Sequence, residues 1–376
     1  DTAGEFAPGN LVYFVASACD EVSMHPQGDL NLVGLSSRTP FIRGTFDKLA
    51  IRTEFPGRGD YKTARFMYTE KDFTDAHREM TGWLLDSIMA QMVDGIAGSR
   101  ELSAEEVRSL IDRAPFLGAD AVAVGLVDRM EDRVSFEERL EEREPGARMV
   151  SARTYLRRGH APSSGPTIAV VTATGAIMRG ESGQSFNPLF GGEIMGSETI
   201  TRAFRDAREV KGLEAVVFRI DSPGGSAMAS EIIREEMLRT AEKVPVVVSM
   251  ANVAASGGYW ITCGAQKIVA EPGTITSSIG VFAGHVNTSD FWSEKLGVTY
   301  GRLDRGANAN IYGDLEDWTD AQRAVVDRLL DRIYDDFLDR VAESRGMSRE
   351  EVDAIGRGRV FTGAQAVEKG LVDVLG

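Results

Sequence analysis

Hydrophobic residues in the C-terminal part of the chain fall into short apolar runs separated by amphipathic stretches. The runs predict strands at residues 168–171, 215–220 and 244–250, and the amphipathic stretches predict helices at 199–209 and 227–241. Strands that are apolar on both faces and alternate with helices are typical of a parallel sheet with helices on each side. We therefore expect a layered α/β domain.

The same pattern occurs twice along the chain. Asp-Phe-Thr-Asp-Ala at residues 72–76 returns as Asp-Trp-Thr-Asp-Ala at 317–321, and Gly-Leu-Val-Asp at 125–128 returns at 370–373, with both pairs 245 residues apart. Each copy contains one long amphipathic helix, predicted at 74–98 and 319–345, followed by a short helix and a strand that contains Gly-Leu-Val-Asp. A constant offset over several segments indicates two copies of one structural unit.

The boundary between the copies is marked by composition. Residues 144–166 are rich in Pro, Gly, Ser and Arg, which is typical of a linker. We predict a first repeat at residues 1–143, a linker at 144–166 and a second repeat at 167–376. Counting back by the offset places the start of the first copy before Asp1, so we expect the first repeat to lack its N-terminal strands.

Composition narrows the function classes. A chain of 376 residues with 43% hydrophobic content is long enough for two cores, and its net charge of −15 disfavours a nucleic-acid partner. The four histidines have no metal-ligand spacing with cysteines or carboxylates, so we expect no metal and no cofactor. No apolar run is long enough to span a bilayer.

The two copies differ in their candidate chemistry. Ser256 lies in Ala-Ala-Ser-Gly-Gly at 254–258, after a strand and a bend of small residues, where it is expected to open a helix. The positive end of that helix would favour a developing oxyanion, although a serine there can equally be a simple N-cap. The corresponding stretch of the first copy, residues 6–11, contains no serine.

Two further segments carry candidate groups. Asp-Ser-Pro-Gly-Gly-Ser at 221–226 is either an ordinary tight turn or a turn whose backbone N–H groups point at a ligand. Lys62 belongs to the first copy, whereas residues 306–310 of the second copy contain no lysine. Lys62 precedes the apolar residues 66–68, so it is a candidate for a buried base, with a solvated surface amine as the alternative.

These motifs together carry a resemblance to a known family. Residues 222–226 (Ser-Pro-Gly-Gly-Ser), 254–259 (Ala-Ala-Ser-Gly-Gly-Tyr) and 276–282 (Thr-Ser-Ser-Ile-Gly-Val-Phe) resemble the signal peptide peptidase SppA (protease IV) family. Residues 59–64 (Gly-Asp-Tyr-Lys-Thr-Ala) are similar to the lysine motif of its long, two-repeat form. The resemblance implies an α/β fold of tandem ClpP/crotonase-like domains.

The resemblance also implies a role for each site residue. Ser256 would be the nucleophile and Lys62, supplied by the first repeat, the general base of a Ser-Lys dyad. Ser278 would orient the lysine amine, and the N–H groups of Gly225 and Gly257 would form the oxyanion hole.

The activity implied is that of a serine endopeptidase acting on remnant signal peptides and other apolar peptides. The family resemblance further implies a homotetramer associated with the bacterial inner membrane, with its catalytic part outside the bilayer on the periplasmic side. An anchor, if present, would lie in a segment absent from this chain. The Gly-rich stretch 179–196 would rim a hydrophobic groove beside the serine.

Three alternatives remain open at this point. His285, 29 residues after Ser256, could be the base, because related ClpP-like folds use a Ser-His-Asp triad. The crotonase fold could instead carry an acyl-CoA enzyme, since that fold uses a similar oxyanion hole. Finally, a first repeat without its opening strands could make the chain an inactive assembly subunit.

Overall fold

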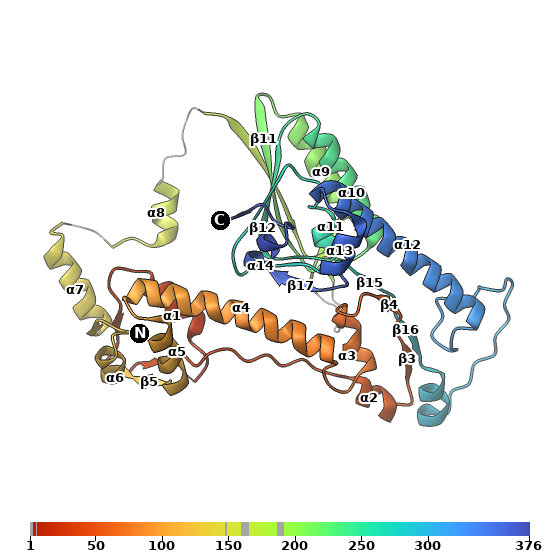
Figure 1. Cartoon of the computed structure of the whole chain (residues 1–376), viewed down its shortest axis with the longest axis horizontal. Coiled ribbons are helices and arrows are strands. Elements are labelled where there is room, and N and C mark those ends of the chain that lie inside the picture. Colours follow the sequence, from red (N-terminus) through yellow and green to blue (C-terminus); the bar gives the residue numbers. More distant parts are fainter. Residues whose placement is uncertain (1–2, 5, 147–148, 159–164, 186–191) are drawn as a thin grey trace. The chain divides into compact units, whose positions relative to one another are not determined.

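The chain forms two compact units in the computed structural model, which describes residues 3–4, 6–146, 149–158, 165–185 and 192–376 (Figure 1). Unit 1 comprises Asp1–Ser37 and Leu85–Gly165, and unit 2 comprises Arg38–Leu84 and Pro166–Gly376. Unit 2 therefore contains a segment, Arg38–Leu84, that the sequence assigns to the first repeat. The repeat boundaries at 143 and 167 describe sequence copies and stay a prediction.

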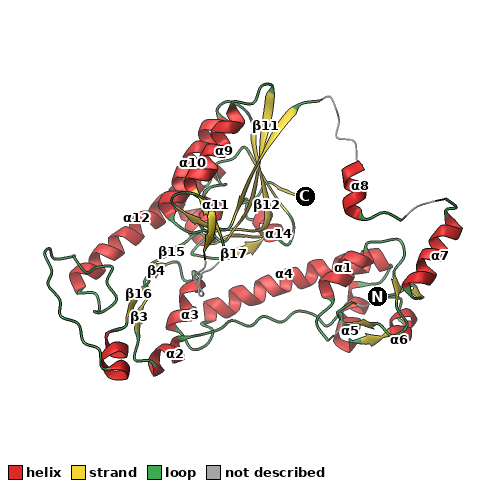
Figure 2. Ribbon diagram, turned by 180° about the vertical axis from the view of Figure 1, so that it is seen from behind, coloured by secondary structure: helices red, strands yellow, loops and turns green. Residues whose placement is uncertain are grey.

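A seven-stranded sheet lies at the centre of unit 2 (Figures 1 and 2). Its main path runs β17, β14, β12, β11, β7, and β13 joins β12 to β18. The strands are β7 (Thr167–Thr174), β11 (Leu213–Ser222), β12 (Val246–Ala255), β13 (Lys267–Ala270), β14 (Ile275–Ser277), β17 (Val360–Thr362) and β18 (Val374–Leu375). All neighbours are parallel except β14 and β17, so the predicted parallel sheet is confirmed.

Strand β12 is longer than the sequence pattern predicts. The expected bend of small residues after Met250 is wrong, because the strand continues to Ala255. Its first half pairs with β13 and its second half with β14, while Ala254 also pairs with Ser222 of β11 after a register shift. Backbone pairing on both sides thus compensates for the low strand propensity of alanine, and it places the next residue, Ser256, at the carboxyl end of this central strand.

The sheet is buried more completely on one face than on the other. Val216 and Phe218 of β11 and Val248 of β12 are fully buried, whereas Val217 and Val247 are only half-buried. Helices α9 (Ser197–Arg208) and α10 (Ala227–Ala241) lie along the buried face (Figures 1 and 2). Burial therefore alternates along these strands rather than extending to both faces as the apolar runs predict.

The predicted helices of the second repeat are confirmed in type and nearly in length. Besides α9 and α10, the long helix α12 (Asp320–Arg345) begins at a capping box, in which the Thr319 hydroxyl and the Gln322 side chain satisfy each other's backbone N–H groups. Helix α10 begins at Ser226, whose hydroxyl accepts from the N–H of Ala229. The remaining helices of unit 2 are α2 (Arg43–Lys48), η1 (Thr63–Arg65), α3 (Phe66–Thr69), α11 (Gly257–Trp260), η2 (Phe291–Lys295), α13 (Arg349–Ile355) and α14 (Gly363–Glu368).

Two short strand pairs join the two sequence copies inside unit 2. Strand β3 (Arg52–Glu54) pairs with β16 (His285–Asn287), and β4 (Gly57–Arg58) pairs with β15 (Val281–Phe282), both antiparallel. A separate three-stranded sheet contains β8 (Ala176–Met178), β9 (Gly183–Ser185) and β10 (Gly192–Gly196). Strands β9 and β10 belong to the Gly-rich stretch 179–196, and β8 directly precedes it. Residues 186–191 of this stretch lie outside the described residues.

Unit 1 has its own core around Tyr13, Leu32, Ile96 and Leu126. Its strands form two-stranded pairs, and helix α4 (Asp75–Arg100) contributes its second half. The elements are α1 (Asn10–Ser17), β1 (Ser23–Met24), β2 (Asp29–Leu30), α5 (Ala104–Arg113), β5 (Phe116–Leu117), α6 (Gly118–Ala123), β6 (Arg129–Met130), α7 (Arg133–Arg143) and α8 (Ala152–Arg158). Helix α8 falls within the predicted linker, whose residues 147–148 and 159–164 lie outside the described residues.

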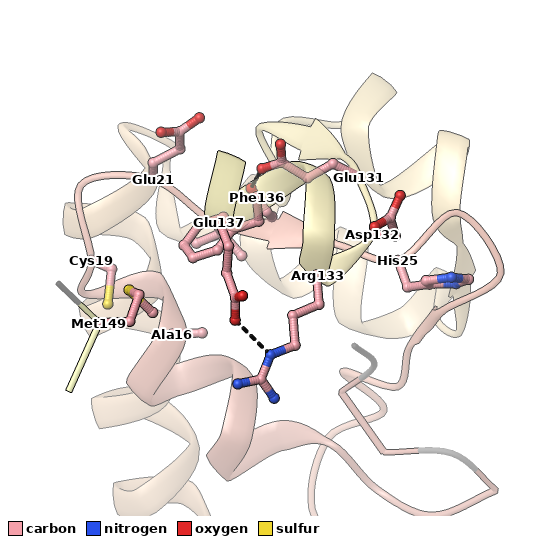
Figure 3. A pocket seen from close by; sticks show the side chains of 12 residues that line it. Ala16, Cys19, Glu21, His25, Glu131, Asp132, Arg133, Phe136, Glu137 and Met149 are labelled. Carbon is pink, nitrogen blue, oxygen red and sulfur yellow. Dashed lines mark hydrogen bonds and ion pairs between the residues drawn. The ribbon is translucent and has the colours of Figure 1, made fainter. Parts of the chain in front are cut away.

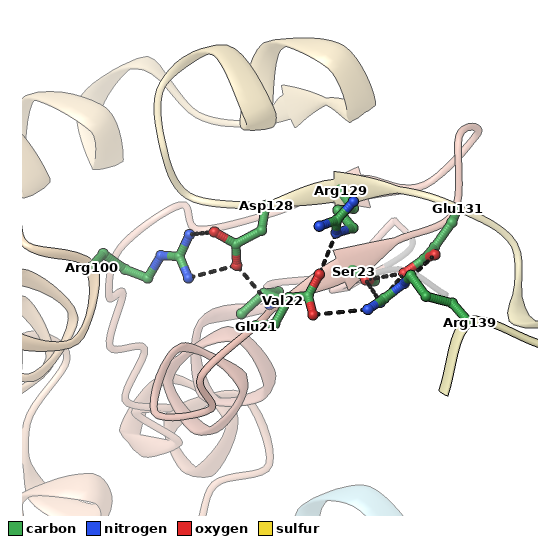
Figure 4. A network of polar contacts seen from close by, with 8 residues as sticks. All are labelled: Glu21, Val22, Ser23, Arg100, Asp128, Arg129, Glu131 and Arg139. Carbon is green, nitrogen blue, oxygen red and sulfur yellow. Dashed lines mark hydrogen bonds and ion pairs between the residues drawn. The ribbon is translucent and has the colours of Figure 1, made fainter. Parts of the chain in front are cut away.

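The repeated Gly-Leu-Val-Asp motif makes the same contacts in both copies. In unit 1, Arg100 binds the Asp128 carboxylate, which also accepts from the N–H of Val22 (Figure 4). In unit 2, Arg345 binds Asp373, which accepts from the N–H of Ile268. The motif forms the turn before the last strand of each copy and not the strand itself, because its residues are committed to these bonds.

A cavity of about 420 Å³ opens in unit 1 beside Cys19 and His25 (Figure 3). Three of the four carboxylates that line it are paired with arginines, Glu21 and Glu131 with Arg139 and Glu137 with Arg133. The fourth, Asp132, caps helix α7. Across the described residues, no helix combines the length and apolar character needed to cross a bilayer.

Candidate active site

Ser256 lies at the end of β12 and at the start of α11. Its backbone has φ of 56° and ψ of −121°, a conformation that is costly for a residue with a Cβ atom. The strain is held by two bonds, from the Ser256 N–H to the Ser277 carbonyl at 2.7 Å and from the Trp260 N–H to the Ser256 carbonyl at 3.0 Å. The Ser256 hydroxyl makes no capping bond, so a simple N-cap role does not account for it.

Lys62 reaches the same place from the other sequence copy. Strands β3 and β4 hold the segment before it against β16 and β15, and Lys62 then precedes the short helix η1. Its side chain is buried, with 5% exposed. Because the side chain is buried, Lys62 is not a solvated surface amine.

The Lys62 amine contacts three oxygen atoms. Its Nζ lies 2.9 Å from Ser256 Oγ, 2.9 Å from Ser278 Oγ and 2.9 Å from the Ser278 carbonyl oxygen. Ser277 and Ser278 also have positive φ, 73° and 58°, so the backbone that presents these oxygens is itself strained. The structure thus brings together Lys62, Ser256 and Ser278, although 194 residues separate the first two in the sequence.

Burial lowers the pKa of the Lys62 amine to about 7. The cause is desolvation, because an ammonium loses its hydration in the interior and no carboxylate among the described residues hydrogen-bonds to it. A substantial fraction of the amine is therefore neutral near neutral pH. A neutral amine beside a hydroxyl is able to accept its proton.

The Pro-Gly-Gly turn at 223–225 lies against Ser256. It is held by strand β8, because the Ile177 N–H donates to the Gly224 carbonyl and the Ile177 carbonyl accepts from the N–H of Ser226, both at 2.9 Å. Gly224 has φ of +100°, and a Cβ there would come within 2.6 Å of the Gly257 nitrogen and 2.7 Å of Ser256 Cβ. The close approach of the two segments therefore requires glycine.

Gly225 and Gly257 both line a cavity of about 80 Å³ that contains Ser256 and Lys62. Within the described part of the chain, neither backbone N–H has a hydrogen-bond acceptor. The rest of the lining is mostly apolar and consists of Ala227, Trp260, Gly280, Val281, Phe282, Ile333 and Phe337. Backbone N–H groups without acceptors, beside a hydroxyl in a mostly apolar cavity, form the arrangement that stabilises an oxyanion.

His285 is engaged elsewhere in unit 2. It lies on β16, its ring stacks on Trp318 with 4.6 Å between centroids, and its Nε2 is 2.7 Å from the Glu316 carbonyl oxygen. It does not belong to the lining of the cavity that contains Ser256. The geometry therefore favours Lys62 over His285 as the partner of the serine.

The sequence motifs missed a turn that contacts the lysine segment. The residues 357–359 precede β17, and the Arg357 carbonyl accepts from the Tyr61 N–H at 2.8 Å while the Arg359 carbonyl accepts from the Ser278 N–H at 2.7 Å. A Cβ at Gly358 would come within 2.3 Å of the Lys62 nitrogen. Arg-Gly-Arg in a surface loop gives no hydrophobic pattern, so only its contacts reveal it.

Comparison with known proteins assigns the chain to a family. A family model described as peptidase family S49 matches residues 7–145 and 239–376. The chain belongs to peptidase family S49. This confirms the resemblance carried by the motifs and the expectation of a serine peptidase family. The two matched regions and the α/β architecture confirm the predicted class of tandem α/β repeats with a layered sheet and flanking helices.

Among curated S49-like relatives, "Protease 4" of Salmonella typhi is 33% identical over 384 residues, covering 97% of this chain and 60% of that protein. "Serine protease SPPA, chloroplastic" of Arabidopsis thaliana is 31% identical, covering 97% of this chain and 54% of that protein. The chain thus spans between half and two thirds of the length of these relatives. A solved ClpP1 mutant from Listeria monocytogenes aligns with a TM-score of 0.35 and 15% identity, over 55% of this chain and 90% of that one.

Proposed function

We propose that this S49 chain is a serine endopeptidase with a Ser-Lys dyad, in which Ser256 is the nucleophile and Lys62 the general base. The observation that carries the proposal is the 2.9 Å distance between Lys62 Nζ and Ser256 Oγ in a site where burial favours the neutral amine. Ser278, whose Oγ and carbonyl oxygen both contact Nζ, would hold the amine in place.

The proposed reaction is acyl transfer. Ser256 Oγ attacks a peptide carbonyl while Lys62 takes its proton, and the N–H groups of Gly225 and Gly257 bind the resulting oxyanion. Lys62 then gives the proton to the leaving amine, and an acyl-enzyme remains on Ser256. Water, deprotonated by Lys62, attacks the acyl-enzyme and releases the second product with restoration of the serine hydroxyl.

The substrates proposed are apolar peptides, including remnant signal peptides. The apolar lining of the cavity at Trp260, Ile333 and Phe337 supports this class, because it would favour an apolar side chain beside the scissile bond. Following the family resemblance, we further propose a homotetramer associated with the bacterial inner membrane. Its catalytic part would face the periplasmic side, and an anchor, if present, would lie in a segment outside this chain.

A direct test compares two substrate classes. Purified protein is incubated with a fluorogenic peptide that has apolar residues around the cleavage site, and separately with an acyl-CoA thioester. We expect peptide cleavage that is lost in Ser256→Ala, and no CoA release. CoA release without peptide cleavage would indicate a crotonase-type acyl-CoA enzyme, and turnover of neither substrate would indicate an assembly subunit.

A further inference from the structure

The segment that carries Lys62 has little regular structure of its own. Between β4 and η1 it runs through residues 59–62, and the Lys62 N–H bonds only locally, to the Gly59 carbonyl at 3.1 Å. A lysine amine sits at the end of a flexible four-carbon chain, so its position depends on how firmly the backbone beneath it is fixed. Something outside this segment must therefore fix it.

The turn of residues 357–359 supplies those contacts. The Arg357 carbonyl accepts from the Tyr61 N–H at 2.8 Å, and the Arg357 guanidinium pairs with Asp60. The Arg359 guanidinium lies over the Tyr61 ring, 3.6 Å from its centroid. Gly358, with φ of +87°, lies directly against the Lys62 backbone, where any Cβ would clash.

The same turn also fixes the other partner of the amine. The Arg359 carbonyl accepts from the Ser278 N–H at 2.7 Å, and the Gly358 N–H donates to the Ile279 carbonyl at 2.7 Å. Three consecutive residues thus contact both the lysine segment of the first sequence copy and the serine segment of the second. The distance between Lys62 Nζ and Ser278 depends on both sets of contacts.

We propose that the turn Arg357-Gly358-Arg359 is a positioning element, which holds the Lys62 amine against Ser256 and Ser278 mainly through the stack of Arg359 on Tyr61. This inference rests on the proposed function of Lys62. The Arg357–Asp60 pair contributes less, because both side chains are largely exposed, with 45% and 63% accessible, and exposed ion pairs are weak. A planar guanidinium over an aromatic ring is a stronger and more directional contact.

The charged side chains around Lys62 are otherwise committed to other partners. Arg58 binds Asp327 and Asp331 on α12, and Arg65 donates to the Phe55 carbonyl. The Arg359 guanidinium also donates to the Ala354 carbonyl at 3.2 Å. Loss of the Arg359 side chain would therefore act on the amine by loosening and hydrating its segment, and not by removing a direct bond to Nζ.

The test is Arg359→Ala, which removes the guanidinium and keeps the backbone bonds of the turn. We expect kcat for peptide cleavage to fall about tenfold with KM changed less than twofold, because misplacement of a catalytic group affects the chemical step. The midpoint of the pH–kcat profile should also rise by about half a unit to one unit, because a better-hydrated amine holds its proton more tightly. Arg359→Lys, which keeps the charge but not the planar group, should restore only part of the rate.

Two further variants make the result specific. Tyr61→Phe keeps the ring under the guanidinium and removes only the hydroxyl that donates to the exposed Glu79 at 2.9 Å, so it should retain the wild-type pH midpoint. Tyr61→Ala should instead match Arg359→Ala, and the double variant should be no worse than either single variant. Arg349→Ala is the matched control, since Arg349 is an exposed arginine on α13 that pairs with Asp335 and Asp339 and should leave kcat and the midpoint unchanged.

A second readout does not depend on peptidase activity. NMR titration of protein labelled at its lysine side chains, with Lys62 assigned by Lys62→Met, reports the amine pKa directly. The inference is overturned if Arg359→Ala leaves this pKa and the pH midpoint where they are in wild type. If wild type cleaves no peptide but the NMR midpoint still shifts in Arg359→Ala, the proposed function fails and the positioning role stands.

Discussion

The starts of helix α1 in unit 1 and of helix α11 in unit 2 occupy corresponding places in the two copies, one residue away from the 245-residue offset of the sequence motifs. The correspondence is fixed by two tyrosines, because Tyr13 donates to the Leu126 carbonyl at 2.7 Å and Tyr259 to the Leu371 carbonyl at 2.8 Å. Three residues before Tyr259 stands Ser256, and three residues before Tyr13 stands Asn10.

The two residues have different surroundings. The Asn10 side chain donates to the Gly34 carbonyl and accepts from the Gly34 N–H, so both ends of its amide bind the backbone of a loop. The Ser256 hydroxyl instead faces the Lys62 amine at 2.9 Å. The two copies share the tyrosine contacts that stabilise the fold and differ at the residue that carries the candidate chemistry. The fold of a copy therefore does not depend on which residue stands at that position.

The largest effect is expected at this pair of positions. Ser256→Ala should lower kcat for peptide cleavage by about 10⁴-fold or more, since loss of a nucleophile leaves only binding and oxyanion stabilisation. Asn10→Ala should leave the rate within about twofold. Steady-state kinetics of both variants checks the comparison, and equal losses would mean that the copies are not chemically distinct.

The next effect concerns the base. Lys62→Met keeps most of the volume of the side chain and should lower kcat by about 10³-fold, because among the described residues Lys62 alone offers a base to the Ser256 hydroxyl. His285→Ala, which removes a ring stacked on Trp318, should keep most of the activity of the folded protein. Near-normal activity in Lys62→Met together with loss of activity in His285→Ala would indicate a histidine base instead of the Ser-Lys dyad.

A smaller effect is expected at the turn that faces Ser256. Gly224→Ala should lower kcat by about 10²-fold, because its Cβ would displace the Gly257 N–H from the oxyanion position. Gly180→Ala is the matched control, since Gly180 also has positive φ, +94°, but has open space around the added Cβ. Similar losses in both would show that backbone strain alone, and not the site geometry, is responsible.

The smallest effect is expected at the arginine–aspartate contacts that both copies share. Arg100→Ala and Arg345→Ala each remove a largely buried guanidinium that donates two hydrogen bonds to an aspartate. Each should therefore lower the free energy of unfolding by about 1–3 kcal/mol. Hydrogen exchange of amides in each unit, measured as a function of denaturant concentration, gives the free energy of unfolding of that unit in each variant. A large loss in one copy and none in the other would contradict the equivalence of the scaffolds.

The sequence predicted the regular elements well where the signal is local. Helices α10 and α12 match the predicted ranges within one residue, because their amphipathic stripes and caps lie in the segments themselves. The extension of β12 to Ala255 was missed, because alanines carry little strand preference and the pairing partners are distant in sequence.

The site was predictable only in part. The candidate roles of Ser256, Lys62 and Ser278 came from the family resemblance, since no local pattern connects residues so far apart. The pairs β3–β16 and β4–β15, which bring Lys62 into unit 2, are two or three residues long and give no periodic signal. The stack of Arg359 on Tyr61 is likewise a tertiary contact, between two half-buried residues that are 298 positions apart in the sequence.

The central claim is that one lysine from the first copy activates one serine of the second. The most direct measurement is the rate at which a fluorophosphonate labels the wild-type protein and Lys62→Met, with the labelled residue located by mass spectrometry. The rate is measured from about pH 5 to about pH 9, a range that extends below and above the pKa of the lysine amine. We predict labelling at Ser256 alone, with a rate that rises through a pH of about 7, because the amine accepts a proton only above its pKa, and almost no labelling in Lys62→Met. Labelling of Ser256 at the wild-type rate in Lys62→Met, or labelling of a different residue, would contradict the account.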